Sequence, residues 1–336
     1  MDQITVGFFS SKRYDQTVFD PLSASFPIDI KHIEARLDET TVSLAQGCDC
    51  VCVFVNDELN AIVVKELAAL GVKHIALRCA GYNNVDIAQC HEVGIAVSHV
   101  PQYSPEAVAE HAVALILTLN RKMHKSYNRV KEGNFDLQGL MGFTMRGKTV
   151  GVIGTGNIGK AFVRILSGFG CKILCHDPYP DLSITSEQCQ YVSLKTLFAS
   201  ADIISLHCPL SQENRYLIDE NAIAQMKPGV MLINTSRGGL IDTSALIQGL
   251  KSHHVGYVGL DVYEMESELF FRDHSCEVIQ DDIFQRLSTF HNVIITGHQG
   301  FFTQEAMNEI ANVTLQNIHD YVNNKPVVKR FLGLAD

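Results

Sequence analysis

A glycine-rich segment in the middle of the chain has the spacing of a phosphate-binding turn. Gly154, Gly156 and Gly159 fit the pattern G-x-G-x-x-G, with an apolar strand-like run before them and a helix-like run after them. In such a turn the first glycine allows a tight bend, the second lets the backbone approach a pyrophosphate, and the third lets the helix pack closely on the strand. The N-terminus of the helix would add N–H groups and a partial positive charge.

Asp177 favours a dinucleotide as the ligand of this turn. The glycines alone would also fit an ordinary connection between a strand and a helix. Asp177, however, ends the next strand-like run, 18 residues (177 − 159) after the last glycine. A carboxylate there accepts hydrogen bonds from the ribose hydroxyls of an adenine dinucleotide and repels a 2′-phosphate, and no arginine follows in residues 178–181. The segment therefore predicts NAD binding in preference to NADP.

Three further side chains follow predicted strands, where ligands of open parallel sheets bind. Arg237 suits a substrate carboxylate because its guanidinium is planar and always charged. His298 could protonate a carbonyl oxygen that receives a hydride, and Glu266 beside it would favour the charged imidazolium. Taken singly, Arg237 fits a solvated loop, Glu266 fits an acidic surface with Glu264 and Glu268, and His298 is one of 14 histidines. Their joint placement favours hydride chemistry on a 2-oxo acid.

The composition bounds the classes of protein that could carry such a site. The 336 residues correspond to about two domains of roughly 150 residues each. A formal charge of −10 disfavours a general nucleic-acid binder and a binder of anionic membranes. The N-terminal residues lack the apolar centre of a signal peptide, and the longest apolar run, 112–119, is too short to span a bilayer. Ten cysteines without a C-x-x-C pair indicate reduced thiols, so we expect a cytoplasmic protein with no metal site.

Alternating strand-like and helix-like segments predict two α/β units with parallel sheets. The first unit occupies about residues 4–100, and the second begins at Lys148. Short apolar strands separated by helices are typical of parallel sheets that helices cover. Between the units, a single long helix is expected from about Glu106 to Lys131. Its first part is apolar on nearly every face, which indicates burial between domains or subunits. A last helix is expected over 303–323.

Long motifs along the chain resemble one family of enzymes. These motifs are RCAGYNNVD (78–86), VPQYSPEAVAEHA (100–112), GTGNIG, HDPYP, SLHCPL, NTSRGGLID, GLDVYEMESELFF, VIQDDIFQRLS and TGHQGF. They are similar to those of the D-isomer-specific 2-hydroxyacid dehydrogenases and, within that family, to the fermentative D-lactate dehydrogenases of bacteria. The resemblance covers essentially the whole chain. It implies an NAD-dependent oxidoreductase that reduces pyruvate, a small-molecule substrate, to D-lactate.

The resemblance also implies a role for individual residues. Arg237 would bind the substrate carboxylate, Glu266 would pair with His298, and His298 would be the acid–base, whereas Glu264 would take no part. The further residues implied to lie on the cofactor are Asn157, Ile158, Asp177, Cys208, Pro209, Asn214, Thr235, Ser236 and Asp261. The residues implied to contact the substrate are Tyr103, Ala80 and Gly81. Packing at a hinge is an alternative role for Tyr103, and capping a loop is one for Asn214.

The domain arrangement is implied in the same way. Residues 1–101 and 300–336 would form the substrate domain, and residues 102–299 would form an NAD-binding Rossmann domain inserted into it. Both would have Rossmann-like or flavodoxin-like parallel sheets. The helix from Glu106 would lie at the subunit interface of a homodimer or homotetramer. Enzymes acting on hydroxyisocaproate, glycerate or phosphoglycerate stay open as alternatives, as does an NADH-sensing corepressor that binds a protein partner.

Overall fold

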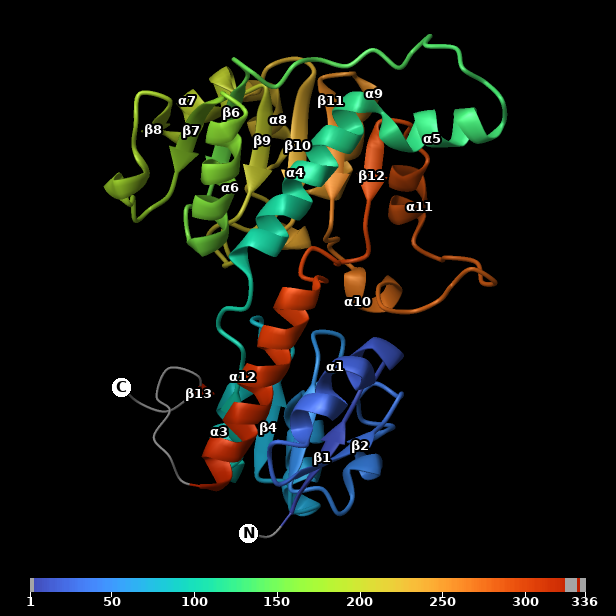
Figure 1. Ribbon diagram of the computed structural model, residues 1–336, viewed down its shortest axis with the longest axis vertical. Helices are drawn as coiled ribbons and strands as arrows, with labels where there is room; N and C mark the ends of the chain where they lie inside the picture. Colours follow the sequence, from blue (N-terminus) through green and yellow to red (C-terminus); the bar gives the residue numbers. More distant parts are fainter. Residues whose placement is uncertain (1–2, 324–330, 333–336) are drawn as a thin grey trace. The chain divides into compact units, whose positions relative to one another are not determined.

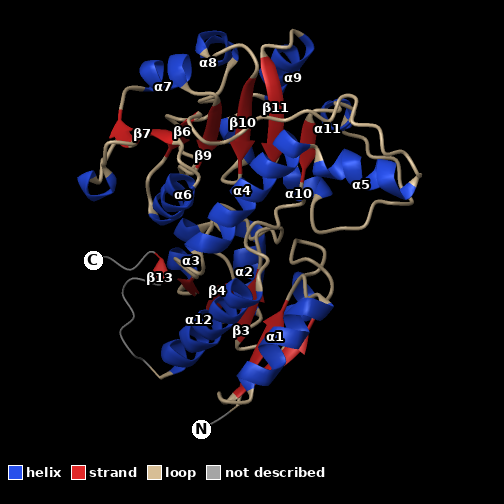
Figure 2. Cartoon of the chain, turned by 45° about the horizontal axis from the view of Figure 1, so that its top comes forward, coloured by secondary structure: helices blue, strands red, loops and turns tan. Residues whose placement is uncertain are grey.

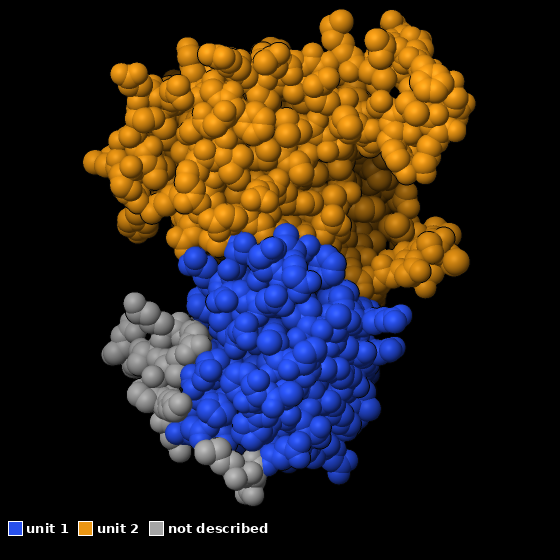
Figure 3. All heavy atoms as spheres, in the orientation of Figure 1, with its two compact units in different colours: residues 1–104, 302–336 blue, residues 105–301 orange. Residues whose placement is uncertain are grey.

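The chain divides into two compact units, which are described one at a time (Figure 3). The computed structural model describes residues 3–323 and 331–332. Unit 1 comprises residues 1–104 and 302–336, and unit 2 comprises residues 105–301. From the sequence, we predicted the domain boundaries after residue 101 and before residue 300. The assignment of the substrate to unit 1 and of the cofactor to unit 2 stays a prediction.

Unit 1 is built on a six-stranded sheet with the order β13-β5-β4-β3-β1-β2 (Figure 1). Five strands are parallel, and β13 pairs antiparallel with β5. The strands are β1 (Ile4–Phe8), β2 (Ile28–His32), β3 (Cys50–Val53), β4 (His74–Leu77), β5 (Ala96–Ser98) and β13 (Phe331–Leu332). The helices are α1 (Arg13–Ser23), α2 (Ala61–Ala69), α3 (Ile87–Val93) and α12 (Gln304–Val322). Helices α1 and α12 pack side by side, and α2 packs on α3.

Unit 2 is built on a seven-stranded sheet with the order β12-β11-β10-β9-β6-β7-β8, parallel throughout (Figure 2). Its strands are β6 (Thr149–Ile153), β7 (Lys172–His176), β8 (Cys189–Tyr191), β9 (Ile203–Leu206), β10 (Val230–Asn234), β11 (Val255–Leu260) and β12 (Val293–Ile295). Its helices are α4 (Pro105–Arg121), α5 (Met123–Lys131), α6 (Asn157–Gly168), α7 (Leu194–Ser200), α8 (Glu220–Gln225), α9 (Thr243–Lys251), α10 (Glu266–Leu269) and α11 (Asp282–Ser288). The predicted α/β class with two parallel sheets is confirmed.

The strand order of unit 2 fixes where a ligand can bind. The chain adds β7 and β8 on one side of β6, then returns to add β9 to β12 on the other side. At such a reversal the loops after the two neighbouring strands diverge and leave a crevice beyond the carboxyl ends of the strands. In unit 2 these are the loops after β6 and β9, which start with Gly154 and His207.

Two apolar cores hold the sheet of unit 2. One core joins α4 and α6 to the sheet, and the other joins α7, α8, α9 and α11 to it. All five residues of the inner strand β10 are buried, as expected for a strand covered on both faces. Gly151 of β6 lets α7 pack closely, because a Cβ atom there would lie 2.4 Å from Cδ2 of Leu197. Helices on both faces thus fix the strand ends that carry the candidate site.

Two features of the fold differ from the sequence prediction. The single helix expected from Glu106 to Lys131 is wrong, because Lys122 adopts a left-handed conformation (φ +50°) and separates α4 from α5. The strands β2 and β8 were not expected. Both lie at an edge of their sheet, and each has only a few buried apolar residues to indicate a strand. In the part of the chain that the structure describes, no helix is long and apolar enough to cross a membrane.

Candidate active site

The side chains of Glu266 and His298 form a hydrogen-bonded pair at the carboxyl ends of β11 and β12. Nδ1 of His298 lies 2.9 Å from Oε1 of Glu266, and both side chains are only partly exposed. The second oxygen, Oε2, accepts a hydrogen bond from the backbone N–H of Tyr263 at 3.1 Å. The carboxylate therefore fixes the orientation of the imidazole through Nδ1. The Nε2 atom is then the one that can exchange a proton with a ligand.

Tyr263 anchors the turn that carries Glu266. Its side chain is buried, and its hydroxyl donates a hydrogen bond to Oδ2 of Asp281 at 2.7 Å. Burial, and then this carboxylate, raise the pKa of Tyr263, so the hydroxyl stays a donor. Asp281 in turn caps the N-terminus of α11 by accepting from the N–H of Phe284. The backbone N–H that holds Glu266 is thus tied to a helix.

His298 has an unusual backbone conformation that a buried carboxylate maintains. Its φ of +54° is left-handed, a conformation that costs energy in residues other than glycine but that histidine adopts more often than most. On its C-terminal side, the N–H groups of Gln299 and Gly300 donate to the two oxygens of Asp261 at 2.8 and 2.7 Å. On its N-terminal side, the hydroxyl of Thr296 donates to the same carboxylate at 2.5 Å. Asp261 therefore holds the loop on both sides of His298.

The Asp261 carboxylate is itself buried and ionised. Its side chain is in the interior of unit 2, where Nε2 of His111, on α4, lies 3.3 Å from Oδ1. Burial alone would raise the pKa of Asp261, but hydrogen bonds from His111, Thr296 and Gln299 outweigh it and lower the pKa below its ordinary value. The sequence placed Asp261 beside the nicotinamide, and that role stays a prediction. Its contacts add a positioning role for the His298 loop that the sequence did not indicate.

Arg237 reaches the same region from the end of β10. Its segment packs directly on the turn before Glu266, because a Cβ atom on Gly238 would lie 2.1 Å from the carbonyl carbon of Tyr263. The side chain of Asn234 donates to the Arg237 carbonyl at 2.8 Å and fixes the bend. Among the described residues, the guanidinium forms no ion pair with a carboxylate; it donates to the carbonyl of Ser236 at 2.7 Å. A cation without a counter-ion near an imidazole suits an anionic ligand.

The turn after β6 has the shape that a dinucleotide requires. Gly154 has a φ of +93°, and a Cβ atom on it would lie 2.5 Å from the backbone nitrogen of Cys208. A Cβ atom on Gly159 would lie 2.1 Å from the carbonyl oxygen of Gly154. Gly156, the N-cap of α6, has open space at its Cβ position. The first and third glycines thus pack the turn closely, whereas the second leaves room for a ligand at the helix N-terminus, where Asn157 and Ile158 form the first turn.

Asp177 lies at the end of β7, directly beside this turn. Its Oδ2 accepts from the Thr155 N–H at 2.6 Å and from the Thr155 hydroxyl at 3.1 Å, and its Oδ1 accepts from the Tyr179 N–H at 2.8 Å. Partial burial opposes ionisation, but these bonds outweigh it and lower the pKa of Asp177. A negative charge is therefore held at the place where the ribose of a dinucleotide would lie.

The remaining predicted residues of unit 2 line the loops after β9 and β10. The hydroxyl of Ser236 donates to the Cys208 carbonyl at 2.6 Å and joins these loops. Asn214 donates to the Pro209 carbonyl at 2.7 Å and accepts from the Ser211 N–H, which is the loop-capping role left open by the sequence. The Thr235 hydroxyl is buried and has no hydrogen-bond partner among the described residues. Such an orphaned group fits a bound ligand that would satisfy it.

The predicted substrate residues Ala80, Gly81 and Tyr103 belong to unit 1. The segment after β4 is held in place because His99 Nδ1 lies 2.9 Å from the Ala80 carbonyl oxygen, and the Cys79 thiol donates to the Gly81 carbonyl. Tyr103 precedes α4 and is partly buried. Their relation to Arg237 and His298 stays a prediction.

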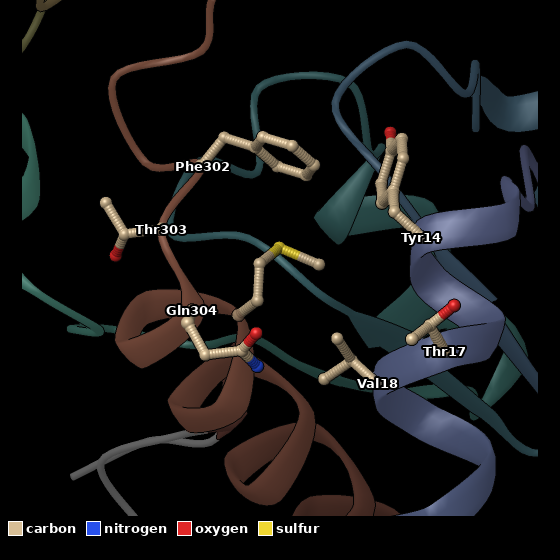
Figure 4. A pocket seen from close by; sticks show the side chains of 7 residues that line it. Tyr14, Thr17, Val18, Phe302, Thr303 and Gln304 are labelled. Atoms are coloured by element: carbon tan, nitrogen blue, oxygen red, sulfur yellow. The ribbon is translucent and has the colours of Figure 1, made fainter.

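Unit 1 also contains a cavity that the sequence did not indicate (Figure 4). It has a volume of about 220 Å³, lies between α1 and the start of α12, and is lined by Tyr14, Thr17, Val18, Phe302, Thr303, Gln304 and Met307. The rings of Tyr14 and Phe302 meet edge to face with centroids 4.8 Å apart. Burial, and then the neighbouring Asp15, raise the pKa of Tyr14 to about 12. The lining is therefore uncharged near neutral pH and suits apolar groups.

Comparisons with known proteins point to one family. Residues 113–300 match the model of the "D-isomer specific 2-hydroxyacid dehydrogenase, NAD binding domain". The D-lactate dehydrogenase of Escherichia coli is 52% identical over 310 residues, which are 92% of this chain and 94% of that protein. The solved pyruvate reductase of Chlamydomonas reinhardtii is 46% identical with a TM-score of 0.93, and covers 97% of this chain and 98% of its own. The D-lactate dehydrogenase of Aquifex aeolicus, solved with NAD and lactic acid, is 31% identical with a TM-score of 0.87, and covers 98% of this chain and 100% of its own.

The buried carboxylate of Asp261 yields a prediction about pH and stability. Asp261→Asn replaces an acceptor by an amide whose NH2 group faces other donors, so we expect a loss of about 3 kcal/mol of unfolding free energy at pH 7. Because the pKa of Asp261 is lower in the folded chain than the ordinary value of about 3.9, its ionised form stabilises the fold above pH 4. That stabilisation disappears as the pH falls through the lower, folded-state pKa.

Urea unfolding of the two chains between pH 7 and pH 3 measures this effect. The difference between wild type and Asp261→Asn should be constant down to about pH 5 and narrow below about pH 4. Glu187→Gln, which changes an exposed carboxylate before β8, serves as the control and should match wild type. Equal stability of Asp261→Asn and wild type at pH 7 would refute the positioning role.

Proposed function

The chain belongs to the D-isomer-specific 2-hydroxyacid dehydrogenases, and from this premise we propose that it reduces pyruvate to D-lactate. The reaction is pyruvate + NADH + H⁺ ⇌ D-lactate + NAD⁺. The NAD cofactor predicted from the glycine turn and Asp177 is confirmed by the family. The observation that carries the proposal is the Glu266–His298 pair, 2.9 Å apart, in the same region as Arg237, which has no carboxylate partner in the part of the chain that the structure describes. The names of the Escherichia coli and Chlamydomonas reinhardtii relatives support pyruvate and D-lactate as the reactants.

When bound, NADH would supply the hydride, and side chains of unit 2 would supply the positive charge that binds the substrate and the proton. Arg237 binds the carboxylate of pyruvate through two parallel hydrogen bonds and polarises the neighbouring carbonyl. The protonated Nε2 of His298 gives its proton to the carbonyl oxygen as the hydride arrives at carbon, so that no free alkoxide forms. Glu266 stabilises the imidazolium and holds the ring through Nδ1. In the reverse direction the same imidazole accepts the hydroxyl proton of D-lactate.

The chain's own turn after β6 holds the cofactor in this proposal. Gly156 and the first turn of α6 would hold the pyrophosphate, and Asp177 would accept hydrogen bonds from the adenosine ribose. Thr235, whose buried hydroxyl has no partner among the described residues, contacts the nicotinamide side. Residues 102–299 would thus serve as the NAD-binding domain, which also carries Tyr103, and residues 1–101 with 300–336 would serve as the substrate domain that contributes Ala80 and Gly81.

The substrate assignment is tested with a panel of 2-oxo acids. We expect NADH oxidation with the highest kcat/KM for pyruvate, and D-lactate as the enantiomer formed. His298→Ala should lose about 10² to 10⁴ of kcat and still bind NADH, because only the proton donor is removed. His91→Ala, which changes an exposed histidine of unit 1, is the control and should keep full activity.

Three outcomes would contradict the proposal. These are L-lactate as the product, turnover of a phosphorylated 2-oxo acid but not of pyruvate, and full activity of His298→Ala. A chain that turned over no 2-oxo acid but captured a specific protein would instead fit the corepressor alternative.

We also propose that the chain forms a homo-oligomer through α5 and the segment that follows it. Six large apolar side chains in this stretch are between 49% and 87% exposed, namely Met123, Tyr127, Val130, Phe135, Leu137 and Met141. Monomeric proteins seldom expose so many large apolar side chains in one short stretch. A second copy presenting the same surface would bury them around a two-fold axis, the commonest symmetry of homo-oligomers.

Light scattering of the purified chain tests this interface. We expect wild type to have at least twice the mass of a single chain, and Phe135→Asp/Leu137→Asp to be a monomer. Leu182→Asp, at an equally exposed leucine outside the stretch, should keep the wild-type mass. A monomeric wild type, or an oligomer that Phe135→Asp/Leu137→Asp leaves intact, would rule the interface out.

A further inference from the structure

Unit 2 also contains a cavity. It lies at the amino ends of the strands, whereas the catalytic residues follow their carboxyl ends. It has a volume of about 190 Å³ and is formed where α4 ends, α5 begins, and β11 and β12 start. Its lining residues are Leu119, Lys122, His124, Lys125, His253, Val255, Gly256, Tyr257, His291 and Asn292. We call it the cationic cavity, because it is lined by two lysines and three histidines and by no aspartate or glutamate.

The charges of the cationic cavity are not compensated by the chain. Among the described residues, neither lysine nor any of the three histidines forms an ion pair. Burial, followed by Lys122 and then Arg129, lowers the pKa of Lys125. Burial, followed by Lys125, lowers the pKa of His124. In a chain with a formal charge of −10, two neighbouring lysines at one cavity with no carboxylate in its lining are unexpected unless an anion shares it.

Two residues of the lining have a left-handed backbone, and one lysine of the lining is fixed by its neighbours. Lys122 (φ +50°) and His253 (φ +60°) are both left-handed residues that connect elements at the cavity wall. The Lys122 ammonium lies 5.8 Å from the centre of the Tyr257 ring and donates to the Met141 carbonyl. The Nδ1 atom of His124 is buried and has no hydrogen-bond partner among the described residues. The ring of His124 also interacts with the backbone of Thr118, so its Nδ1 atom is one polar group of the lining that a ligand could satisfy.

We propose that the cationic cavity binds a phosphate group, free or as part of a small ester, and that its occupancy adjusts the His298 loop. Lysine binds phosphate as a point charge, and two lysines can balance the charge of a phosphate dianion, whereas the planar fork of an arginine, which suits a carboxylate, is absent from the lining. The cavity is of a size for a small ligand. It is separate from the turn after β6, which binds the pyrophosphate of the cofactor at the other edge of the sheet.

Three elements connect the cationic cavity to the catalytic loop. Strand β11 begins at the cavity and ends next to Asp261, and its six residues span about 20 Å. Strand β12 begins after Asn292 and ends next to Thr296. Helix α4 places Leu119 at the cavity and His111 on the Asp261 carboxylate. A ligand that shifts the starts of these elements can therefore alter the network that holds His298. This second half of the proposal rests on the proposed dehydrogenase function, whereas phosphate binding does not.

Thermal unfolding with and without inorganic phosphate tests the binding. Saturating NADH is present throughout, so that the cofactor turn is filled, and chloride at equal ionic strength is the reference. Phosphate should raise the Tm of wild type by about 3 °C with a saturable dependence on concentration. Lys125→Gln and His253→Asn should lose most of this shift; asparagine is chosen because it tolerates the left-handed backbone. Lys195→Gln, which removes the same charge from the exposed face of α7, should keep it.

Steady-state kinetics of the same variants tests whether the cationic cavity affects the His298 loop. Phosphate should change the kcat/KM of wild type for pyruvate by about fivefold or more and leave Lys125→Gln unchanged. A titration with glycerol phosphate in parallel tells whether the ester or the free ion is the preferred ligand. No Tm shift beyond that of chloride, or an equal shift in Lys125→Gln and Lys195→Gln, would overturn the site. A Tm shift lost in Lys125→Gln with unchanged kinetics in wild type would overturn the coupling alone.

Discussion

The candidate active site depends on one buried carboxylate. Asp261 stands at the end of β11 and accepts hydrogen bonds from both sides of His298, and it is kept ionised by those same bonds. This arrangement offsets the cost of a left-handed histidine, which would otherwise relax to an ordinary loop conformation. It also determines where the imidazole meets Glu266. The geometry of the proton donor is thus set by a residue that does not touch it.

Close backbone contacts position the other functional groups. Gly238 lets the Arg237 segment lie directly on the turn before Glu266, and Gly154 lets the cofactor turn lie directly on Cys208. Neither contact leaves room for a Cβ atom. The parallel sheet supplies these contacts because its strands all end at one edge, where the loops must cross one another. An acidic chain can therefore bind a small anion by placing at that edge one arginine, Arg237, which forms no ion pair with any carboxylate that the structure describes.

Much of this site could be predicted from the sequence, and the reasons are specific. The glycine turn and Asp177 are close together in sequence and follow a fixed pattern, so their contact was foreseeable. Glu266 was separable from Glu264 only through the family motif, and its contact with His298 agrees with that choice. The positioning role of Asp261 could not be foreseen, because its partners lie 35 or more residues away and two of them are backbone N–H groups. His111, surrounded by apolar helix residues, gave no signal of its contact with Asp261.

The cationic cavity and the helix break illustrate the same limit. The cavity is assembled from residues 119–125, 253–257 and 291–292; the first segment is basic, but nothing in the sequence indicates that the other two lie beside it. The break at Lys122 was hidden because lysine favours helices and gives no turn signal.

The most direct test of the pairing of Glu266 with His298 compares kcat/KM for pyruvate in Glu266→Gln and Glu264→Gln. We predict a loss of at least about tenfold for Glu266→Gln, with NADH affinity unchanged, and wild-type activity for Glu264→Gln. Equal activity in the two variants would contradict the pairing of Glu266 with the proton donor.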